Sequence, residues 1–421
     1  MINTITLSPG VFLRCYQDHR FKQGRLSLQI IRPMDRAEAS KNALLPAVLL
    51  RGTRQYPDLR AITLHLDDLY GAAVGTLVRR VGDYQTTGLA CGFIEDRFAM
   101  EQDQILAPMV SFLEQLLLDP VLEDGVFSRE FVSGEQKNLI SAIDSQRNDK
   151  RAYAAEQMMQ LMCPEDSFGI PRLGTREDVA AIDAFSLYEH YRHILRTSRI
   201  DLFYVGSRSA EEIADLLRPV IAKLSRDYQQ LPAQTAFHES PPQEKTEVLD
   251  VAQGKLCMGF VTDITLRDPR FVAMQMANTI FGGCMTNKLF MVIREKLSLC
   301  YDIGASYHGS KGIVHVSAGI DCNMDATVRQ EVLRQLEACC QGDISEEEME
   351  NARQALLSQL RLPPDSPGSI EGYYATGALS GMTMTPEQYM EKVTSVTKEQ
   401  VVEAARTLRL HTVYFLKGES A

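Results

Sequence analysis

The stretch Phe281–Tyr301 reads FGGCMTNKLFMVIREKLSLCY and predicts a helix, a turn, a second helix and a strand. Its adjacent glycines, Gly282 and Gly283, end the first helical pattern, because glycine commonly follows the last turn of a helix. A second, amphipathic helix then runs through Arg294. An extended segment begins seven residues later, at Tyr301. By itself the stretch indicates a helix with one polar face joined to a strand.

This order of residues resembles a motif of the M16 peptidase family (insulinase or pitrilysin family), subgroup B, to which mitochondrial processing peptidase belongs. The family motif has a glycine-rich turn, a basic residue, Leu-Phe, and then Ile-Arg-Glu-Lys and Gly-Leu-Ala-Tyr. The chain departs from it at Ser298 and Cys300, where glycine and alanine are usual. The residues that it shares with the motif are Gly282, Gly283, Lys288, Leu289, Phe290, Ile293, Arg294, Glu295, Lys296, Leu299 and Tyr301.

The resemblance implies a substrate-binding role for Arg294 and Tyr301, together with the glycine turn at Gly282 and Gly283. In the family this arginine and tyrosine reach into a central cavity, bind the substrate backbone and steady the tetrahedral intermediate at zinc. A guanidinium and a phenol can both donate hydrogen bonds to such oxygens. The alternative is that Arg294 pairs with a local carboxylate and Tyr301 only packs.

Two parts of the chain repeat the same order of elements. Phe127–Ile143 and Ile344–Leu360 are both charged amphipathic helices, and each half ends in a strand followed by glycine. A polar, proline-bearing stretch separates the halves and is typical of a linker. We therefore predict an N-terminal domain, a linker and a C-terminal domain at 1–228, 229–245 and 246–421.

The fold class follows from the grouping of the elements. Strand patterns occur in adjacent runs and helix patterns are longer, which favours an α+β fold with antiparallel-rich sheets and helices packed on one face. The family resemblance implies that both domains are of the LuxS/MPP-like metallohydrolase type.

The zinc site of the family has the pattern His-x-x-Glu-His, followed after about four residues by Gly-Thr. Spacings of three and four place these side chains on one helical face, where two imidazoles hold zinc and the glutamate activates water. The corresponding stretch here, 43–53, reads ALLPAVLLRGT. Its Gly-Thr sets the register, so the three positions fall on Ala43, Pro46 and Ala47. None of these residues can bind a metal or accept a proton.

The third zinc ligand of the family lies on a later helix, seven residues after another glutamate. Counting from Glu135 gives Ala142, which again carries no ligand atom. We expect the first helix to be kept for packing. Pro46 should be tolerated there because Ser40 or Asn42 would cap the helix, so that the missing N–H of proline falls in the first turn.

Two other clusters have spacings found in metal sites. His190 and His193 lie three residues apart, and His65 precedes Asp67 and Asp68. The two histidines lie in a helix that leads to the last strand of the first domain, which explains them without a metal. A solvated helix face explains His65 and its two aspartates. The nine cysteines form no Cys-x-x-Cys pair, which argues against a thiolate zinc site. We predict no metal in this chain.

Charge and hydropathy limit the partners and the location. The formal net charge is −11, which disfavours nucleic acid as a partner. The N-terminal stretch has no basic segment followed by an apolar one, and no apolar run reaches the roughly 20 residues that span a bilayer. We expect a cytoplasmic bacterial protein that does not bind membranes.

These observations predict an inactive M16B homologue that serves as the non-catalytic, substrate-binding subunit of a heterodimeric zinc metallopeptidase. The partner would be a paralogue that carries His-x-x-Glu-His and the zinc. An extended peptide would bind between the subunits, with Gly88–Ile94 as an edge strand for its pairing. The chain also resembles degenerate M16 proteins of Firmicutes, which accompany an intact paralogue and are linked by name to modification of elongation factor P.

Two alternatives to this prediction remain open at the level of sequence. In the first, the chain is a peptide-binding or scaffold protein without proteolytic activity, which could be a homodimer; the M16-like core subunits of respiratory complex III set a precedent. In the second, the chain is a stand-alone zinc peptidase, which requires stoichiometric zinc in the pure chain.

Overall fold

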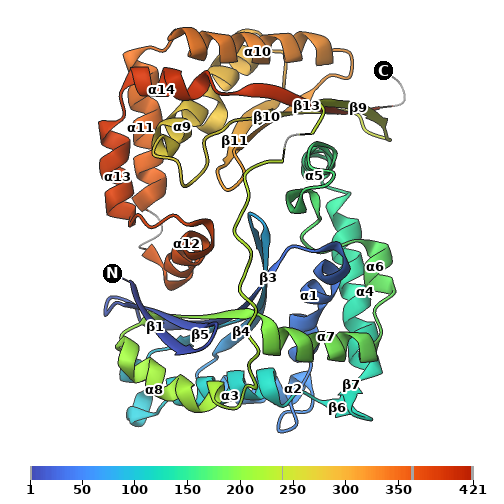
Figure 1. Ribbon diagram of the computed structural model, residues 1–421, viewed down its shortest axis with the longest axis vertical. Helices are drawn as coiled ribbons and strands as arrows, with labels where there is room; N and C mark the ends of the chain where they lie inside the picture. The colour runs from blue at the N-terminus through green and yellow to red at the C-terminus, as the bar shows by residue number, and fades with distance from the viewer. Residues whose placement is uncertain (1, 239, 362–364, 419–421) are drawn as a thin grey trace. The chain divides into compact units, whose positions relative to one another are not determined.

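The computed structural model describes residues 2–238, 240–361 and 365–418, which fold into two compact units (Figure 1). Unit 1 comprises the described residues of 1–144, 170–233 and 364–376, and unit 2 those of 145–169, 234–363 and 377–421. The units are interleaved along the chain, so no single cut separates them. The domain boundaries predicted from the repeat stay a prediction.

The sheet of unit 1 has six strands, all antiparallel to their neighbours except for one parallel pair, β2 and β8. In strand β3, the alternate residues Leu26, Leu28 and Ile30 are buried in the main core, because successive side chains of a strand point to opposite faces of the sheet. In spatial order the strands are β1 (Ile2–Ser8), β2 (Val11–Gln17), β8 (Arg199–Gly206), β3 (Gln23–Pro33), β5 (Tyr84–Ile94) and β4 (Ala73–Val81).

Helices of unit 1 cover the apolar face of this sheet, and Phe112 and Ile213 from two of them join its core. They are α1 (Arg36–Leu49), α2 (Leu59–Asp68), α3 (Leu106–Leu118), α4 (Arg129–Gln146), α6 (Arg176–Ala180), α7 (Ala184–Thr197) and α8 (Ala210–Ile221). Short 3₁₀ turns, η1 (Asp96–Phe98) and η2 (Met100–Gln102), and a small hairpin, β6 (Leu122–Glu123) and β7 (Val126–Phe127), complete the unit.

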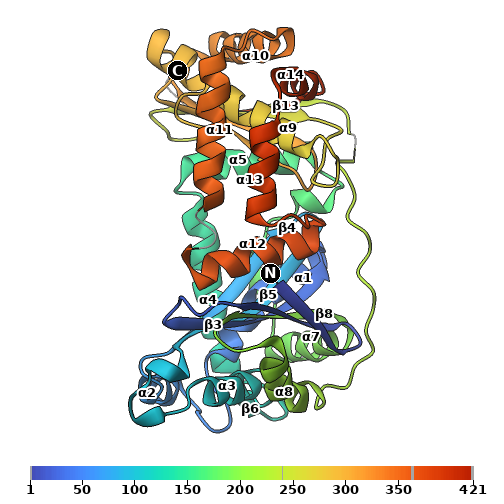
Figure 2. The same cartoon turned by 90° about the vertical axis from the view of Figure 1, so that its left-hand side faces the viewer.

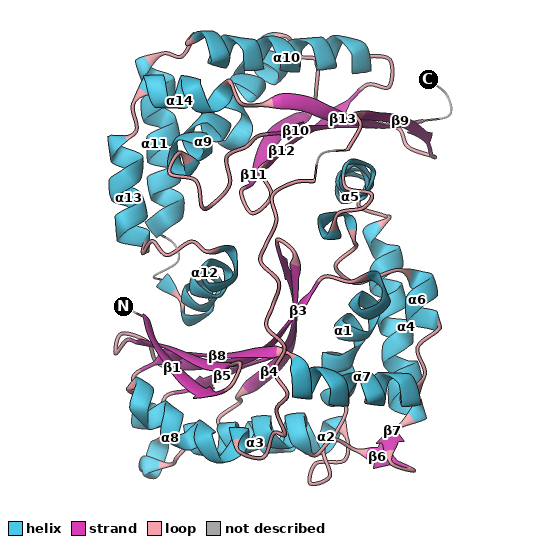
Figure 3. Cartoon of the chain, viewed as in Figure 1, coloured by secondary structure: helices cyan, strands magenta, loops and turns pink. Residues whose placement is uncertain are grey.

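Unit 2 contains a five-stranded sheet with one parallel pair, β13 and β9 (Figure 3). Its spatial order is β11 (Asp302–His308), β12 (Ile313–Ile320), β10 (Gly254–Val261), β13 (Arg409–Lys417) and β9 (Gln243–Val248). Its other elements are η3 (Ser167–Gly169), α9 (Phe271–Asn278), the π-helical segments η4 (Thr279–Gly283) and η5 (Leu289–Lys296), α10 (Asp325–Gln341), α11 (Glu346–Arg361), α13 (Pro386–Ser395) and α14 (Lys398–Ala405). Helices α11 and α13 lie side by side (Figures 1 and 2).

The α+β class and the antiparallel-rich sheets are confirmed, but the sheet of unit 2 carries a helix on each face. One face, which includes Phe260, packs against the α9–η4 segment through Phe281. The opposite face packs against α5 (Lys150–Met162), whose Met162 lies in a cluster with Cys257. Gly259 lies beneath it, because a Cβ there would approach the Met162 sulfur to 2.6 Å.

The second face of the unit 1 sheet also receives a helix from the distant half of the sequence. The first part of α12 (Pro367–Ser380) belongs to unit 1. Its Glu371 side chain is fully buried and pairs with Arg25 and, at 3.2 Å, with Arg79, and it accepts a hydrogen bond from Gln29 at 2.7 Å. Helices α5 and α12 follow α4 and α11, the two helices that the repeat matched. Corresponding helices are thus exchanged between the halves of the chain.

The prediction that Gly88–Ile94 forms an edge strand is wrong. These residues lie in β5, which is paired on both sides by β3 and β4. The sheet of unit 1 ends instead at β1 and β4, and in β4 the Val78 carbonyl already accepts a hydrogen bond from Arg172 at 2.8 Å. Strand order depends on pairing between distant segments, which the strand pattern alone did not reveal.

Within the described part of the chain, no helix has the length and apolar character needed to cross a membrane.

Candidate functional site

The glycine turn of the motif is set by a close approach between two elements of unit 2. A Cβ on Gly282 would lie 2.5 Å from the Ala305 Cβ and 2.8 Å from its backbone nitrogen. Only glycine therefore allows η4 to lie against β11. The two successive π-helical segments, η4 and η5, are a rare local structure that is frequent at functional sites.

Polar contacts fix the start of η5. The Asn287 amide donates to the Cys284 carbonyl, and its oxygen accepts from the Phe290 N–H at 2.7 Å. Lys288 is buried and its ammonium lies 2.8 Å from a Glu348 oxygen on α11. Lys288 therefore anchors the start of η5 to α11.

The predicted substrate-binding residues line one cavity of about 620 Å³ in unit 2. Arg294 comes from η5, Tyr301 directly precedes β11, and the two glycines are the last residues of η4. Their convergence makes a shared binding role geometrically possible, and that role stays a prediction. The lining residues used in the following paragraphs are Gly282, Gly283, Arg294, Tyr301, Arg151 and Asp302.

Arg294 and Tyr301 each have a local partner, but both remain accessible. The Arg294 guanidinium lies 4.6 Å from the centre of the Phe290 ring and 3.3 Å from a Glu295 oxygen, and 40% of its side chain is exposed. Tyr301 is 60% exposed and donates to Asp321 at 2.8 Å, which raises the pKa of the phenol. Exposed ion pairs are weak, so a ligand can compete for both side chains.

Two further cavity residues were not found from the sequence. The Arg151 guanidinium, on α5, lies 2.9 Å from an Asp302 oxygen at the start of β11. Asp302 directly follows Tyr301, so its place next to the motif was a usable signal. Arg151 lies far away in the sequence, and only the packing of α5 on this sheet brings it to the cavity.

One departure from the family motif leaves local strain. Ser298 has a φ of 53°, in the left-handed region that favours glycine. Its N–H still donates to the Arg294 carbonyl at 3.1 Å, which holds the turn between η5 and the segment leading to Tyr301. The glycine expected at this position therefore has a conformational reason.

In unit 1, the three positions that the resemblance assigns to the zinc pattern lie on α1, and the predicted capping of this helix is wrong. Helix α1 begins at Arg36, with Asp35 as its N-cap, so Pro46 lies in the helix interior. Proline cannot donate to the Asn42 carbonyl four residues earlier. The Thr87 hydroxyl, on β5, donates to that carbonyl instead, at 2.5 Å. A neighbouring strand thus compensates for the proline.

A buried polar network surrounds the same turn of α1. The Asn42 amide donates to Gln85 at 2.9 Å, and its oxygen lies 2.7 Å from the His190 Nε2. Because that oxygen can only accept, the His190 Nε2 donates to it. Burial lowers the pKa of His190 to about 4. His193 is exposed, so the two histidines do not form a joined site.

The zinc of the family does not fit these residues. Ala43 and Pro46 are buried, Ala47 is partly buried, and none offers a ligand atom. Ala142 lies on α4, where Glu135 pairs with Arg51 at 3.3 Å, just beyond the end of α1. In the described parts of the chain, no three His, Cys, Asp or Glu residues are grouped so as to hold a metal ion.

His65 has a structural environment in place of a cation site. Its ring stacks on Tyr56 with a centroid distance of 4.3 Å and meets the edge of Phe112 at 5.1 Å. Burial lowers the pKa of His65. These contacts place the imidazole in an aromatic cluster, whereas the sequence predicted a solvated helix face for His65; Asp67 and Asp68 are exposed, as that prediction implies.

Comparisons with known proteins give a consistent result. The family model described as the peptidase M16 inactive domain matches residues 181–356. YmfF of Bacillus subtilis (strain 168), described as a probable inactive metalloprotease, is 28% identical over 409 residues, which cover 97% of this chain and 96% of YmfF. A crystal structure of a conserved protein from Enterococcus faecalis V583 has a TM-score of 0.93 at 28% identity, covering 100% of this chain and 99% of that one. A structure of a peptidase M16 inactive domain from Pseudomonas fluorescens shares the fold, with a TM-score of 0.81 at 15% identity over 99% and 98% of the chains.

The compensation of Pro46 by Thr87 can be tested with a double-mutant cycle. We expect Thr87→Val to lower the free energy of unfolding by about 1–3 kcal/mol, because it leaves the buried Asn42 carbonyl without its donor. With Pro46→Ala already present, the new N–H supplies a donor, so Thr87→Val should cost about 1 kcal/mol less. Urea unfolding followed by circular dichroism measures both costs, and equal costs in the two backgrounds would contradict the assignment.

The strain at Ser298 predicts a stabilising substitution. Ser298→Gly should raise the free energy of unfolding by about 0.5–1 kcal/mol, since relief of the left-handed backbone outweighs the added freedom of the unfolded chain. Ser358→Gly, at an exposed position inside α11, is the matched control and should lower it by about 0.5 kcal/mol. Calorimetry measures both shifts, and a loss of stability at position 298 would refute the strain.

Proposed function

We propose that this chain, an M16 peptidase homologue of the inactive-domain type, is the non-catalytic, substrate-binding subunit of a heterodimeric zinc peptidase. The observation that carries the proposal is a contrast within one molecule. The helix that would hold zinc has Ala43, Pro46 and Ala47, whereas the cavity of unit 2 retains Arg294 and Tyr301. The chain has therefore lost one half of the family's chemistry and kept residues suited to the other half.

In this proposal an M16 paralogue with an intact His-x-x-Glu-His supplies the zinc, the general base and bond cleavage. The present chain contributes hydrogen-bond donors to an extended peptide. The Arg294 guanidinium has five N–H groups and, among the described residues, one ion-pair partner, Glu295, so it can donate to oxygen atoms of the peptide. The raised pKa of Tyr301 keeps its phenol protonated, and therefore a donor, at neutral pH.

The proposal predicts a loss of turnover without a loss of assembly. In the complex with the paralogue, Arg294→Ala should lower kcat/KM by about 10- to 100-fold, which corresponds to the loss of a charged hydrogen bond, and Tyr301→Phe should lower it less. Peptide hydrolysis gives the rates, and size-exclusion chromatography gives the fraction of assembled complex.

Arg329→Ala is the control, because that arginine pairs with Glu244 and does not line the cavity. It should leave both readouts unchanged. Full turnover with Arg294→Ala would reject the assigned role of the cavity. A chain that assembles with no peptidase would favour the alternative of a peptide-binding or scaffold protein.

A further inference from the structure

The charges on the wall of the unit 2 cavity are unequal. Among the described residues, its lining contains two guanidinium groups, Arg151 and Arg294, and a single carboxylate, Asp302. Asp302 lies 2.9 Å from Arg151 and so offsets that charge. The partner of Arg294 is Glu295, which lies outside the lining and is 50% exposed. One positive charge of the wall is therefore left with only a solvent-screened partner.

The hydrogen-bonding groups of the wall are likewise rich in donors. Among the described residues, each guanidinium makes one ion pair, although each carries five N–H groups. Asn287 has its amide and its oxygen occupied within the turn. The Cys284 thiol lies 3.5 Å from the Thr279 carbonyl, to which it can donate. The cavity thus offers several free N–H groups and few acceptors.

An apolar area lies beside these donors. Met285 lines the cavity and is 71% exposed, and Phe290, Ile303 and Ala355 form further parts of the wall. Methionine adapts its shape to different apolar partners. Such an area suits the side chain of one apolar residue, next to the charged group that the arginines would hold.

We propose that this cavity binds a carboxylate of the peptide, from an acidic side chain or from the C-terminus, next to an apolar side chain. The inference rests on the proposed function in taking a peptide as the ligand. It goes beyond that function in naming the class of peptide. A guanidinium can hold a carboxylate through two parallel hydrogen bonds, which a single peptide carbonyl does not provide.

This inference runs against the average charge of the chain. A net charge of −11 by itself favours basic peptides. Charges beyond about 8 Å are largely screened at physiological salt, so the nearest guanidinium groups decide what binds inside the cavity.

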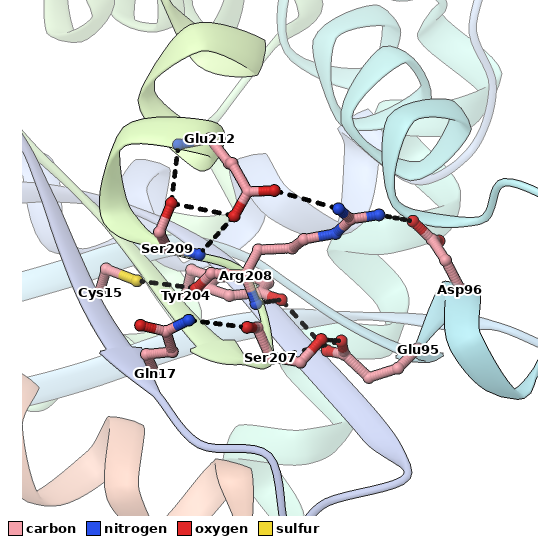
Figure 4. A network of polar contacts seen from close by, with 9 residues as sticks. All are labelled: Cys15, Gln17, Glu95, Asp96, Tyr204, Ser207, Arg208, Ser209 and Glu212. Atoms are coloured by element: carbon pink, nitrogen blue, oxygen red, sulfur yellow. Dashed lines mark hydrogen bonds and ion pairs between the residues drawn. The ribbon is translucent and has the colours of Figure 1, made fainter.

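A polar cavity in unit 1 has a wall whose charges are more evenly paired. Figure 4 draws the polar contacts around Arg208, which lines this cavity. The cavity has a volume of about 410 Å³, and Arg208 lies between Asp96 and Glu212, at 3.0 Å from each. Buried Glu95 beside it accepts a hydrogen bond from Tyr204 at 3.1 Å. The described lining of the cavity carries two guanidinium groups, Arg97 and Arg208, and two carboxylates, Asp96 and Glu212. The formal charges of the wall therefore balance, and the same inference does not extend to this cavity.

Titration calorimetry with the purified chain tests the inference without a partner subunit. The probes are acetylated hexapeptides with leucine followed by Glu, Gln or Lys, each made with a free and with an amidated C-terminus. We expect a carboxylate-bearing peptide to bind at least ten-fold more tightly than the amidated Gln peptide, and the amidated Lys peptide to bind most weakly. The Glu amide and the Gln free acid distinguish a side-chain source of the carboxylate from a C-terminal one.

Two variants and a control complete the test. Arg294→Gln should abolish the preference for a carboxylate, Arg151→Gln should reduce it, and Arg329→Gln, outside the cavity, should leave it intact. No binding, a preference for the Lys peptide, or a preference that survives Arg294→Gln would overturn the inference. Because binding is measured on the isolated chain, such a failure is distinct from the loss of turnover that tests the proposed function.

Discussion

The contact between Gly282 and Ala305 constrains the whole candidate site. Because a Cβ at position 282 would lie 2.5 Å from the Ala305 side chain, the turn can approach β11 only as glycine. The Asn287 side chain then fixes the start of η5, and Lys288 secures η5 to α11 through Glu348. The site is therefore built on a sheet and two anchored helical segments, which favours fixed positions of its donors.

The exchange of helices between the halves adds a second constraint. Helix α5 packs on the sheet of unit 2, and it is α5 that brings Arg151 to the cavity. The first part of α12 packs on the sheet of unit 1 through the buried Glu371. Removing one partner of a buried ion pair is strongly destabilising, so Glu371 ties the folding of unit 1 to a segment from near the end of the chain.

The sequence predicted the parts of the site that are local. The motif from Phe281 to Tyr301 predicted the glycine turn, the helix through Arg294 and the following strand, and these elements converge on one cavity. It could not predict Arg151, whose place depends on how a distant helix packs. The strand at Gly88–Ile94 was taken for an edge because its alternation does not report its neighbours.

The start of α1 shows a second limit of local reasoning. Ser40 and Asn42 are good capping residues in sequence, but Asp35 caps the helix and both lie inside it. Proline was then expected in the first turn, whereas the structure accommodates it in the interior through Thr87 on β5. A donor supplied by another strand leaves no mark near Pro46 in the sequence.

Helix α1 has Ala43, Pro46 and Ala47 where the resemblance places zinc ligands, and the unit 2 cavity is lined by Arg294 and Tyr301. The proposed function, in which this chain binds peptides for another protein's chemistry, rests on this contrast. The most direct test is to purify the tagged chain from its native host and to measure the partner by mass spectrometry and the zinc by elemental analysis. The account predicts a one-to-one complex with a His-x-x-Glu-His paralogue and one zinc per complex, with none retained by this chain after separation. Stoichiometric zinc in the isolated chain, or recovery only as a metal-free monomer or homodimer, would contradict it.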